Sequence, residues 1–86
     1  TALMMAAANG HRDIVDVLLN VGKADTDAKD KNGTTALMLA VRYGHRDTVD
    51  MLLNVGKADA DAKDKDGSTA LTLAARYGRG DIAEVL

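Results

Sequence analysis

Residues 30–62 read DKNGTTALMLAVRYGHRDTVDMLLNVGKADADA, and most of these letters recur in two partial copies, 34 positions earlier in residues 1–28 and 34 positions later in residues 64–86. When residues 1–52 are placed on residues 35–86, 35 of the 52 positions are identical. A repeat of this length is typical of a solenoid, in which each unit packs only against its neighbours. The sequence therefore predicts one array over residues 1–86, with units of about 1–29 (partial), 30–63 and 64–86 (truncated).

The first half of each unit predicts a short helix. Thr35 is a residue type that caps helix starts, and Leu37, Ala40 and Val41 follow it with the i, i+3, i+4 spacing of one apolar helix face. Gly44 then ends the pattern, because glycine adopts the left-handed conformation at a helix end without steric cost.

A second apolar stripe, Val49, Leu52 and Leu53, predicts a second helix that ends at Gly56. The following polar segment has no periodicity and closes on Asp66-Gly67, as its counterpart closes on Asn32-Gly33. Such dipeptides are strong signals for a tight turn. Each unit is thus predicted to be helix, turn, helix and an extended finger with a tight tip.

These motifs resemble the ankyrin repeat over the whole chain. The family's T-P-L-H-x-A motif corresponds to residues 35–40, its G-H turn to Gly44-His45, its V-x-x-L-L core to residues 49–53 and its finger to residues 56–62. The tetratricopeptide repeat, an alternative of similar length, is built around a Trp that this chain lacks. The resemblance implies an all-α repeat solenoid of helix-turn-helix units joined by hairpin-like finger loops.

Three departures from the family pattern are visible. Ala2, Ala36 and Ala70 replace the motif proline, and Met4, Met38 and Thr72 replace its histidine. Lys23 and Lys57 resemble one-residue insertions that lengthen the usual unit to 34, and we expect a bulge after Gly22 and Gly56.

Composition excludes several classes of function. The 86 residues carry 11 Lys and Arg against 13 Asp and Glu, which argues against a nucleic-acid or polybasic membrane surface. The absence of cysteine removes disulfides, thiolate zinc sites and cysteine nucleophiles, and fits a cytoplasmic or nuclear location. No apolar run reaches the length of a membrane span.

Candidate catalytic and metal motifs have simpler interpretations. The finger ending at Gly67 lacks the first Asp and the last Glu of a calcium-binding loop. His11-Arg12-Asp13 and His45-Arg46-Asp47 spell a kinase triplet, but they recur with the repeat, and we expect His and Asp to support helix starts. We therefore expect no enzyme activity, no metal and no cofactor.

The resemblance implies a partner protein gripped by a concave groove of finger tips and first helices. Tyr and Arg, which dominate interface energies, occupy two successive units at the helix positions of this groove. The implied partner-binding residues are the tip positions Lys31, Asn32, Thr34, Lys65, Asp66 and Ser68 and the helix positions Arg42, Tyr43, Arg76 and Tyr77.

A second interpretation stays open. Near-identical units are also expected of structural spacer repeats, natural or consensus-designed, in a longer array without a direct binding role. Neither end of the chain has a polar capping unit, so we expect a fragment of a longer array whose open faces allow end-to-end self-association.

Overall fold

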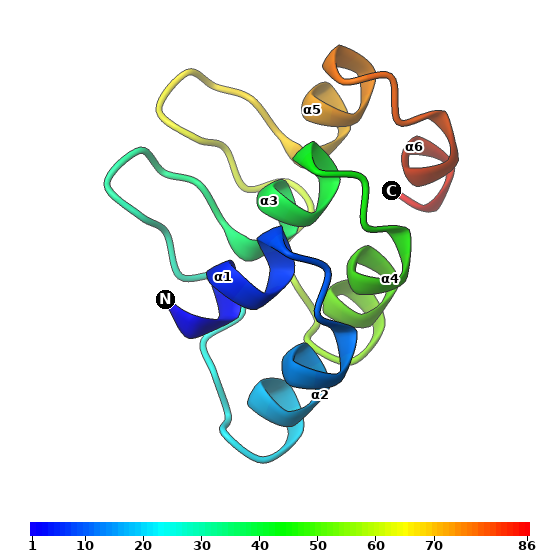
Figure 1. Cartoon of the computed structure of the whole chain (residues 1–86). Coiled ribbons are helices and arrows are strands. Elements are labelled where there is room, and N and C mark those ends of the chain that lie inside the picture. The colour runs from blue at the N-terminus through cyan, green and yellow to red at the C-terminus, as the bar shows by residue number, and fades with distance from the viewer.

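The computed structural model describes all residues from Thr1 to Leu86 and contains six α-helices in three antiparallel pairs (Figure 1). Two long loops, residues 21–35 and 55–69, connect the pairs and project side by side from the stack (Figure 1). The predicted all-α repeat solenoid with finger loops is confirmed. The helices are α1 (Ala2–Ala8), α2 (Arg12–Asn20), α3 (Ala36–Arg42), α4 (Arg46–Asn54), α5 (Ala70–Arg76) and α6 (Gly80–Val85).

We call the first helix of each pair (α1, α3 and α5) the inner helix and the second (α2, α4 and α6) the outer helix. The inner helices begin and end as predicted. The side chains of Thr1, Thr35 and Thr69 accept hydrogen bonds from backbone N–H groups in the first turns of α1, α3 and α5. The turns after these helices contain Gly10, Gly44 and Gly78, with φ angles of +68°, +76° and +69°. Only glycine adopts this conformation freely, so the turn position is strongly specified.

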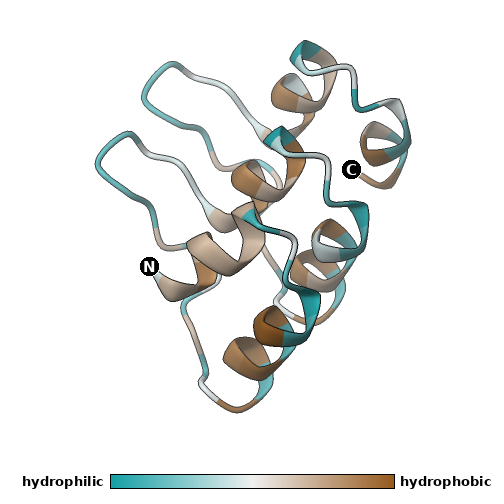
Figure 2. Cartoon of the chain, in the orientation of Figure 1, coloured by the Kyte–Doolittle hydropathy of each residue, from teal (hydrophilic) through white to brown (hydrophobic).

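Neighbouring pairs bury one another. Helix α3 packs between α1 and α5, and α4 packs between α2 and α6. Apolar residues line the surfaces between the pairs, while charged residues lie outside (Figure 2). No helix is both long and apolar enough to cross a bilayer. The largest fully buried side chains are Leu37, Met38, Leu52, Leu73, Ile82, Val15, Val41, Val49 and Thr48.

The histidines do not act at helix starts as we expected. His11 and His45 occupy N-cap positions, but neither side chain makes a capping hydrogen bond. Instead, His45 Nε2 lies 3.0 Å from the backbone oxygen of Ala8 in the preceding unit. A carbonyl only accepts, so the ring donates through Nε2. Histidine at this position joins two units.

The finger tips are held by two aspartates. Asp30 Oδ1 accepts from the N–H groups of Asn32 (2.8 Å) and Thr34 (2.9 Å), and Asp64 Oδ1 accepts from Asp66 and Ser68 at 2.9 Å each. The backbone hydrogen bonds lower the pKa of both carboxyl groups below the usual Asp value, because they stabilise the charged form.

The bend from each outer helix into its finger carries a non-glycine residue in the left-handed region. Lys23 and Lys57, which the sequence marks as insertions, have φ angles of +53° and +54°. Gly22 and Gly56 before them are not left-handed. A Cβ on Gly56 would instead approach the Leu52 carbonyl oxygen to 2.9 Å, so this glycine permits close backbone approach. Both lysines lie in the bend outside the helices, and the helices on either side of it pack against those of the neighbouring pairs.

Replacing Lys23 and Lys57 by glycine is expected to raise the free energy of unfolding. The left-handed conformation costs an L-residue roughly 1–2 kcal/mol, and the greater freedom of glycine in the unfolded chain returns roughly 0.5–1 kcal/mol of this. We expect a net gain of about 0.5 kcal/mol per site, measured by urea unfolding. The matched alanine variants remove the lysine but keep Cβ, and equal stability of the glycine and alanine variants would contradict the assignment.

The lowered pKa values predict a pH dependence with a defined sign. A carboxyl group with a depressed folded-state pKa stabilises the protein above its unfolded pKa, near 3.9, and loses this effect as pH falls through the lower folded value. We therefore expect the urea concentration at the unfolding midpoint to decrease when the pH is lowered below about 4. The double variant Asp30→Asn and Asp64→Asn, which keeps an Oδ1 acceptor, should show a shallower fall.

Asp66→Asn is the control for this experiment. It removes a charge of the same sign from the same finger, and the equivalent residue in the other finger is Asn32. If this variant flattened the pH profile as much as the double variant, general charge repulsion rather than the Asp30 and Asp64 hydrogen bonds would explain it.

Candidate functional site

The two fingers are bonded to each other and form one surface. Lys65 N donates to Asn32 O at 2.9 Å near the tips, and Lys29 Nζ donates to Lys63 O at 2.8 Å. Further from the tips, Asp59 N donates to Asp27 Oδ1 at 2.8 Å. These contacts fix the spacing of the fingers, which lie side by side in Figure 1.

A pocket of about 180 Å³ lies between the fingers and the inner helix α3. Five predicted binding residues lie along it, and sequence reasoning missed the other three. The predicted ones are Asn32, Thr34, Arg42, Lys65 and Asp66, and the others are Asp30, Asp64 and Leu39. The repeated Asp-x-x-Gly-Thr/Ser pattern was the available signal for Asp30 and Asp64, because it is typical of a side-chain-closed turn.

Arg42 has an unusual environment in this pocket. Its Nε atom is buried and has no hydrogen-bond partner, a property that it shares with the Nε atom of Arg79 outside the pocket. The positive charge of Arg42 also contributes to lowering the pKa of both Asp30 and Asp64, after the larger effect of the hydrogen bonds. The guanidinium thus lies near the two carboxylates that close the finger tips, and its Nε–H group is left unbonded.

Arg76, the equivalent residue one unit later, is bonded differently. Its Nη2 donates to Ser68 Oγ at 3.2 Å, so this arginine supports the base of its own finger. Arg76 is exposed, whereas Arg42 is half-buried between two fingers. The two arginines share a sequence motif but not an environment, because Arg42 lies by two fingers and Arg76 bonds only to its own.

Tyr43 and Tyr77 occupy the C-cap positions of α3 and α5 and are 53% and 42% exposed. They do not line the pocket between the fingers. Lys31 is exposed at its finger tip and also lies outside the pocket.

Two predicted tip residues turn inward. Thr34 and Ser68 are only 6% and 3% exposed, because each follows the tip glycine and leads back to the helix start. Thr34 nevertheless lines the pocket between the fingers, whereas Ser68 does not, and a contact of either residue with a partner stays a prediction. The surface-accessible set consists of the eight other predicted residues: Lys31, Asn32, Lys65, Asp66, Arg42, Tyr43, Arg76 and Tyr77.

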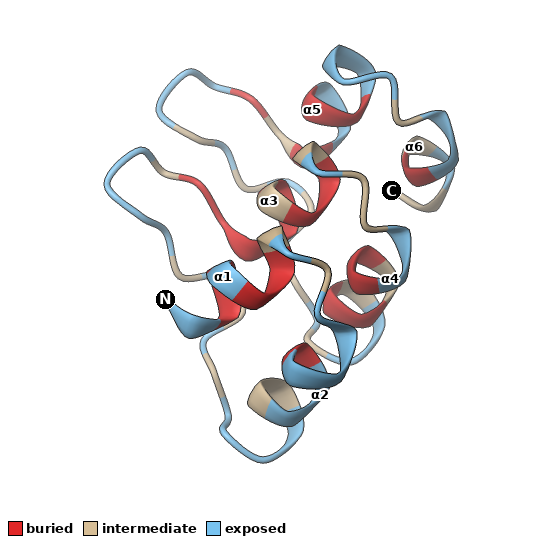
Figure 3. Ribbon diagram, viewed as in Figure 1, coloured by how far each residue is buried: buried red, intermediate tan, exposed pale blue.

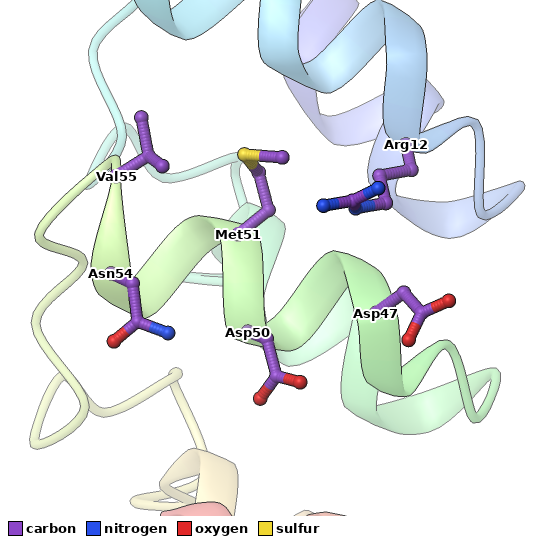
Figure 4. Close-up of a pocket in the computed structure, with 6 residues that line it drawn as sticks. All are labelled: Arg12, Asp47, Asp50, Met51, Asn54 and Val55. Atoms are coloured by element: carbon purple, nitrogen blue, oxygen red, sulfur yellow. The ribbon is translucent and has the colours of Figure 1, made fainter.

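A second pocket, of about 330 Å³, lies on the outer helices and was not anticipated. Figure 4 shows Arg12 of α2 extending toward Met51 of α4. Asp47 and Asp50 lie on α4 as well, on the N-terminal side of Met51. Asn54 and Val55 complete the lining, so the pocket contains no serine, cysteine or histidine. No cluster of three or more His, Asp or Glu side chains is placed to hold a metal ion anywhere in the structure.

Comparisons with known proteins agree with this architecture. The family model for ankyrin repeats, described as three copies, matches residues 3–86. A similar solved structure is the complex of the predatory endopeptidase Bd0816 from Bdellovibrio bacteriovorus with immunity protein Bd3460. The matched chain is 36% identical with a TM-score of 0.90, and the match covers 99% of the present chain and 44% of that chain. The present chain therefore spans less than half the length of that relative, and it belongs to the ankyrin repeat family.

Proposed function

We propose that this chain is a protein-interaction module that binds a partner protein on the face formed by its fingers and inner helices, without catalysis. Ankyrin repeats are protein-interaction modules, and the three helix pairs with bonded fingers provide a fixed surface for this purpose. The partner's identity is left to experiment, and the proposal concerns the face and its chemistry.

The observation that carries the proposal is the unbonded Nε of Arg42 beside the pocket between the fingers. Buried polar groups are nearly always hydrogen-bonded, so an unsatisfied donor next to an open pocket is a candidate ligand contact. Arginine N–H groups only donate hydrogen bonds, so an oxygen acceptor is the group that would pair with this atom. A partner segment that brings such an oxygen between the fingers would satisfy this donor.

Exposed tyrosines support the same face. Tyr43 directly follows Arg42, and Tyr77 directly follows Arg76. Tyrosine and arginine are enriched among residues that dominate binding energy, and both tyrosines are substantially exposed. The solved relative, found in a complex of an endopeptidase with an immunity protein, also supports a protein partner for the present chain.

The spacer function is the second candidate, and the similarity of the units favours it. The Arg-Tyr pair recurs unchanged in two units, as does the segment from Asn20 to Asp25 at Asn54 to Asp59. Duplication alone accounts for this identity, without any selection for binding. The two candidates make opposite predictions for a variant of the finger face.

The deciding experiment is an affinity pull-down from a cell lysate with three baits of equal helicity. Each bait is immobilised at low density. The first is the wild type, the second carries alanine at Arg42, Tyr43, Arg76 and Tyr77, and the third carries alanine at Arg12 and Arg46 on the outer helices. We expect one protein to be retained by the first and third baits and lost by the second. Retention by none would favour the spacer function, and retention by all three would place binding on a surface other than the finger face.

Arg42 and Arg76 are expected to differ in how much they contribute to the free energy of unfolding. Arg42→Met removes an unbonded buried N–H group together with an attraction to Asp30 and Asp64, and these opposing changes leave the free energy of unfolding within about 0.5 kcal/mol. Arg76→Met removes the hydrogen bond to the buried Ser68 hydroxyl and is expected to cost about 1 kcal/mol. Urea unfolding measures both, and a larger loss for Arg42→Met would show that Arg42 is satisfied within the chain.

A further inference from the structure

The pocket between the fingers holds an arginine whose hydrogen-bond donors are unused. The guanidinium of Arg42 carries several N–H groups and makes no hydrogen bond within the chain, whereas Arg76 donates to Ser68 and Arg79 donates to the Arg42 carbonyl oxygen. The fingers beside this pocket are exposed at their tips, while α3 is largely buried (Figure 3). A ligand would therefore reach the pocket from the finger side.

Each finger adds a carboxylate with acceptor positions to spare. A carboxylate has about four acceptor positions on its two oxygens. Asp30 and Asp64 each use two of them, both on Oδ1, to close the turn of their own finger. The backbone hydrogen bonds lower the pKa of both groups, which keeps them charged, and the nearby charge of Arg42 adds to this effect. The pocket thus combines one unused group of donors with two acceptors, one from each finger.

The charges of the lining disfavour a charged ligand. Arg42 and Lys65 are cationic and Asp30, Asp64 and Asp66 are anionic, so the lining carries one net negative charge. An anionic group would meet three carboxylates of its own sign. A cationic group would meet two cations and would have no acceptor for the donors of Arg42. An uncharged group that both donates and accepts hydrogen bonds avoids both conflicts.

The size of the pocket fits a single side chain. Its volume of about 180 Å³ is below the roughly 300–1,000 Å³ that is typical of small-molecule sites. Leu39 is the one apolar residue of the lining, and it offers a contact for methylene groups. A short side chain with an uncharged polar end therefore matches the space.

We propose that this pocket binds the primary carboxamide of an Asn or Gln side chain of the partner protein, an inference that rests on the proposed function. The carboxamide oxygen accepts from the guanidinium of Arg42, and the amide NH₂ group donates to Asp30 and Asp64. A primary amide has two N–H donors, whereas a peptide group or a hydroxyl has one. Among uncharged groups, the primary amide is therefore the one that serves both carboxylates while it accepts from the arginine.

NMR spectroscopy of the wild-type chain with four small probes tests the proposal. Propionamide represents a Gln side chain, propionate a Glu side chain, propylammonium a Lys side chain and N-methylacetamide a peptide group. We expect propionamide to shift the Nε–Hε signal of Arg42 and the backbone N–H signals of Asn32 and Lys65. It should bind about five- to tenfold more tightly than N-methylacetamide, which lacks one N–H donor. The Nε–Hε signal of Arg76 is the internal control and should not move.

Two variants change the pocket in different ways. Arg42→Met removes the donors and should abolish the shifts caused by propionamide. The double variant Asp30→Asn and Asp64→Asn keeps an Oδ1 acceptor in each turn and gives the lining one net positive charge, so propionate should bind it more tightly than propionamide does. Arg12→Met removes a positive charge from the outer helices and should bind propionamide like the wild type. Far-UV circular dichroism verifies that each variant folds.

Several results would overturn the proposal. They are tightest binding of propionate or propylammonium by the wild type, equal affinities for propionamide and N-methylacetamide, shifts confined to residues outside the pocket, and no shift with any probe. The outcome is separable from that of the pull-down. A partner lost with the finger-face bait but no propionamide binding would leave the proposed function in place and reject the carboxamide site. Propionamide binding with no retained partner would support the site and count against a protein partner.

Discussion

No helix pair of this protein buries its own apolar surface, and this constraint governs the rest of the structure. A seven-residue helix and a nine-residue helix joined by a tight turn enclose almost no interior. Burial is supplied by the neighbouring pair, which is why α4, with a unit on either side, contributes four buried residues and α2 contributes one. Stability is therefore shared between units, and the chain behaves as a one-dimensional series of interfaces.

The same constraint explains the form of the binding face. Because the units stack in register, their fingers are brought together at a fixed spacing and bond through backbone groups as well as side chains. The pocket around Arg42 exists only between two units and belongs to neither alone. A side chain that is ordinary in one unit acquires a distinct environment when the next unit covers it, as the contrast between Arg42 and Arg76 illustrates.

Much of this architecture is predictable from local chemistry. Three signals act over only a few residues, so they can be interpreted wherever they occur. They are the threonine at the start of each inner helix, the glycine that follows the end of that helix, and the Asx-Gly dipeptide at each finger tip. The contact made by His45 is not predictable from local chemistry. Its partner Ala8 lies 37 residues away, and no local rule connects the two. The burial of Thr34 and Ser68 also escaped prediction, since the tip signal fixes a turn but does not say which of the residues that follow it become buried.

The left-handed lysines have a consequence for how such a chain can change in length. Lys23 and Lys57 lie in the bend after an outer helix and outside every helix, so a residue gained or lost there alters a loop and does not change the register of a helix face. A whole unit can be gained or lost at an interface because each interface has the same chemistry. Insertions inside a helix have no such outlet, since they would rotate its apolar face away from both neighbours. Duplication and recombination can therefore lengthen the gene in steps of one unit, or adjust it by one codon at the bend, while the stacked interfaces are preserved.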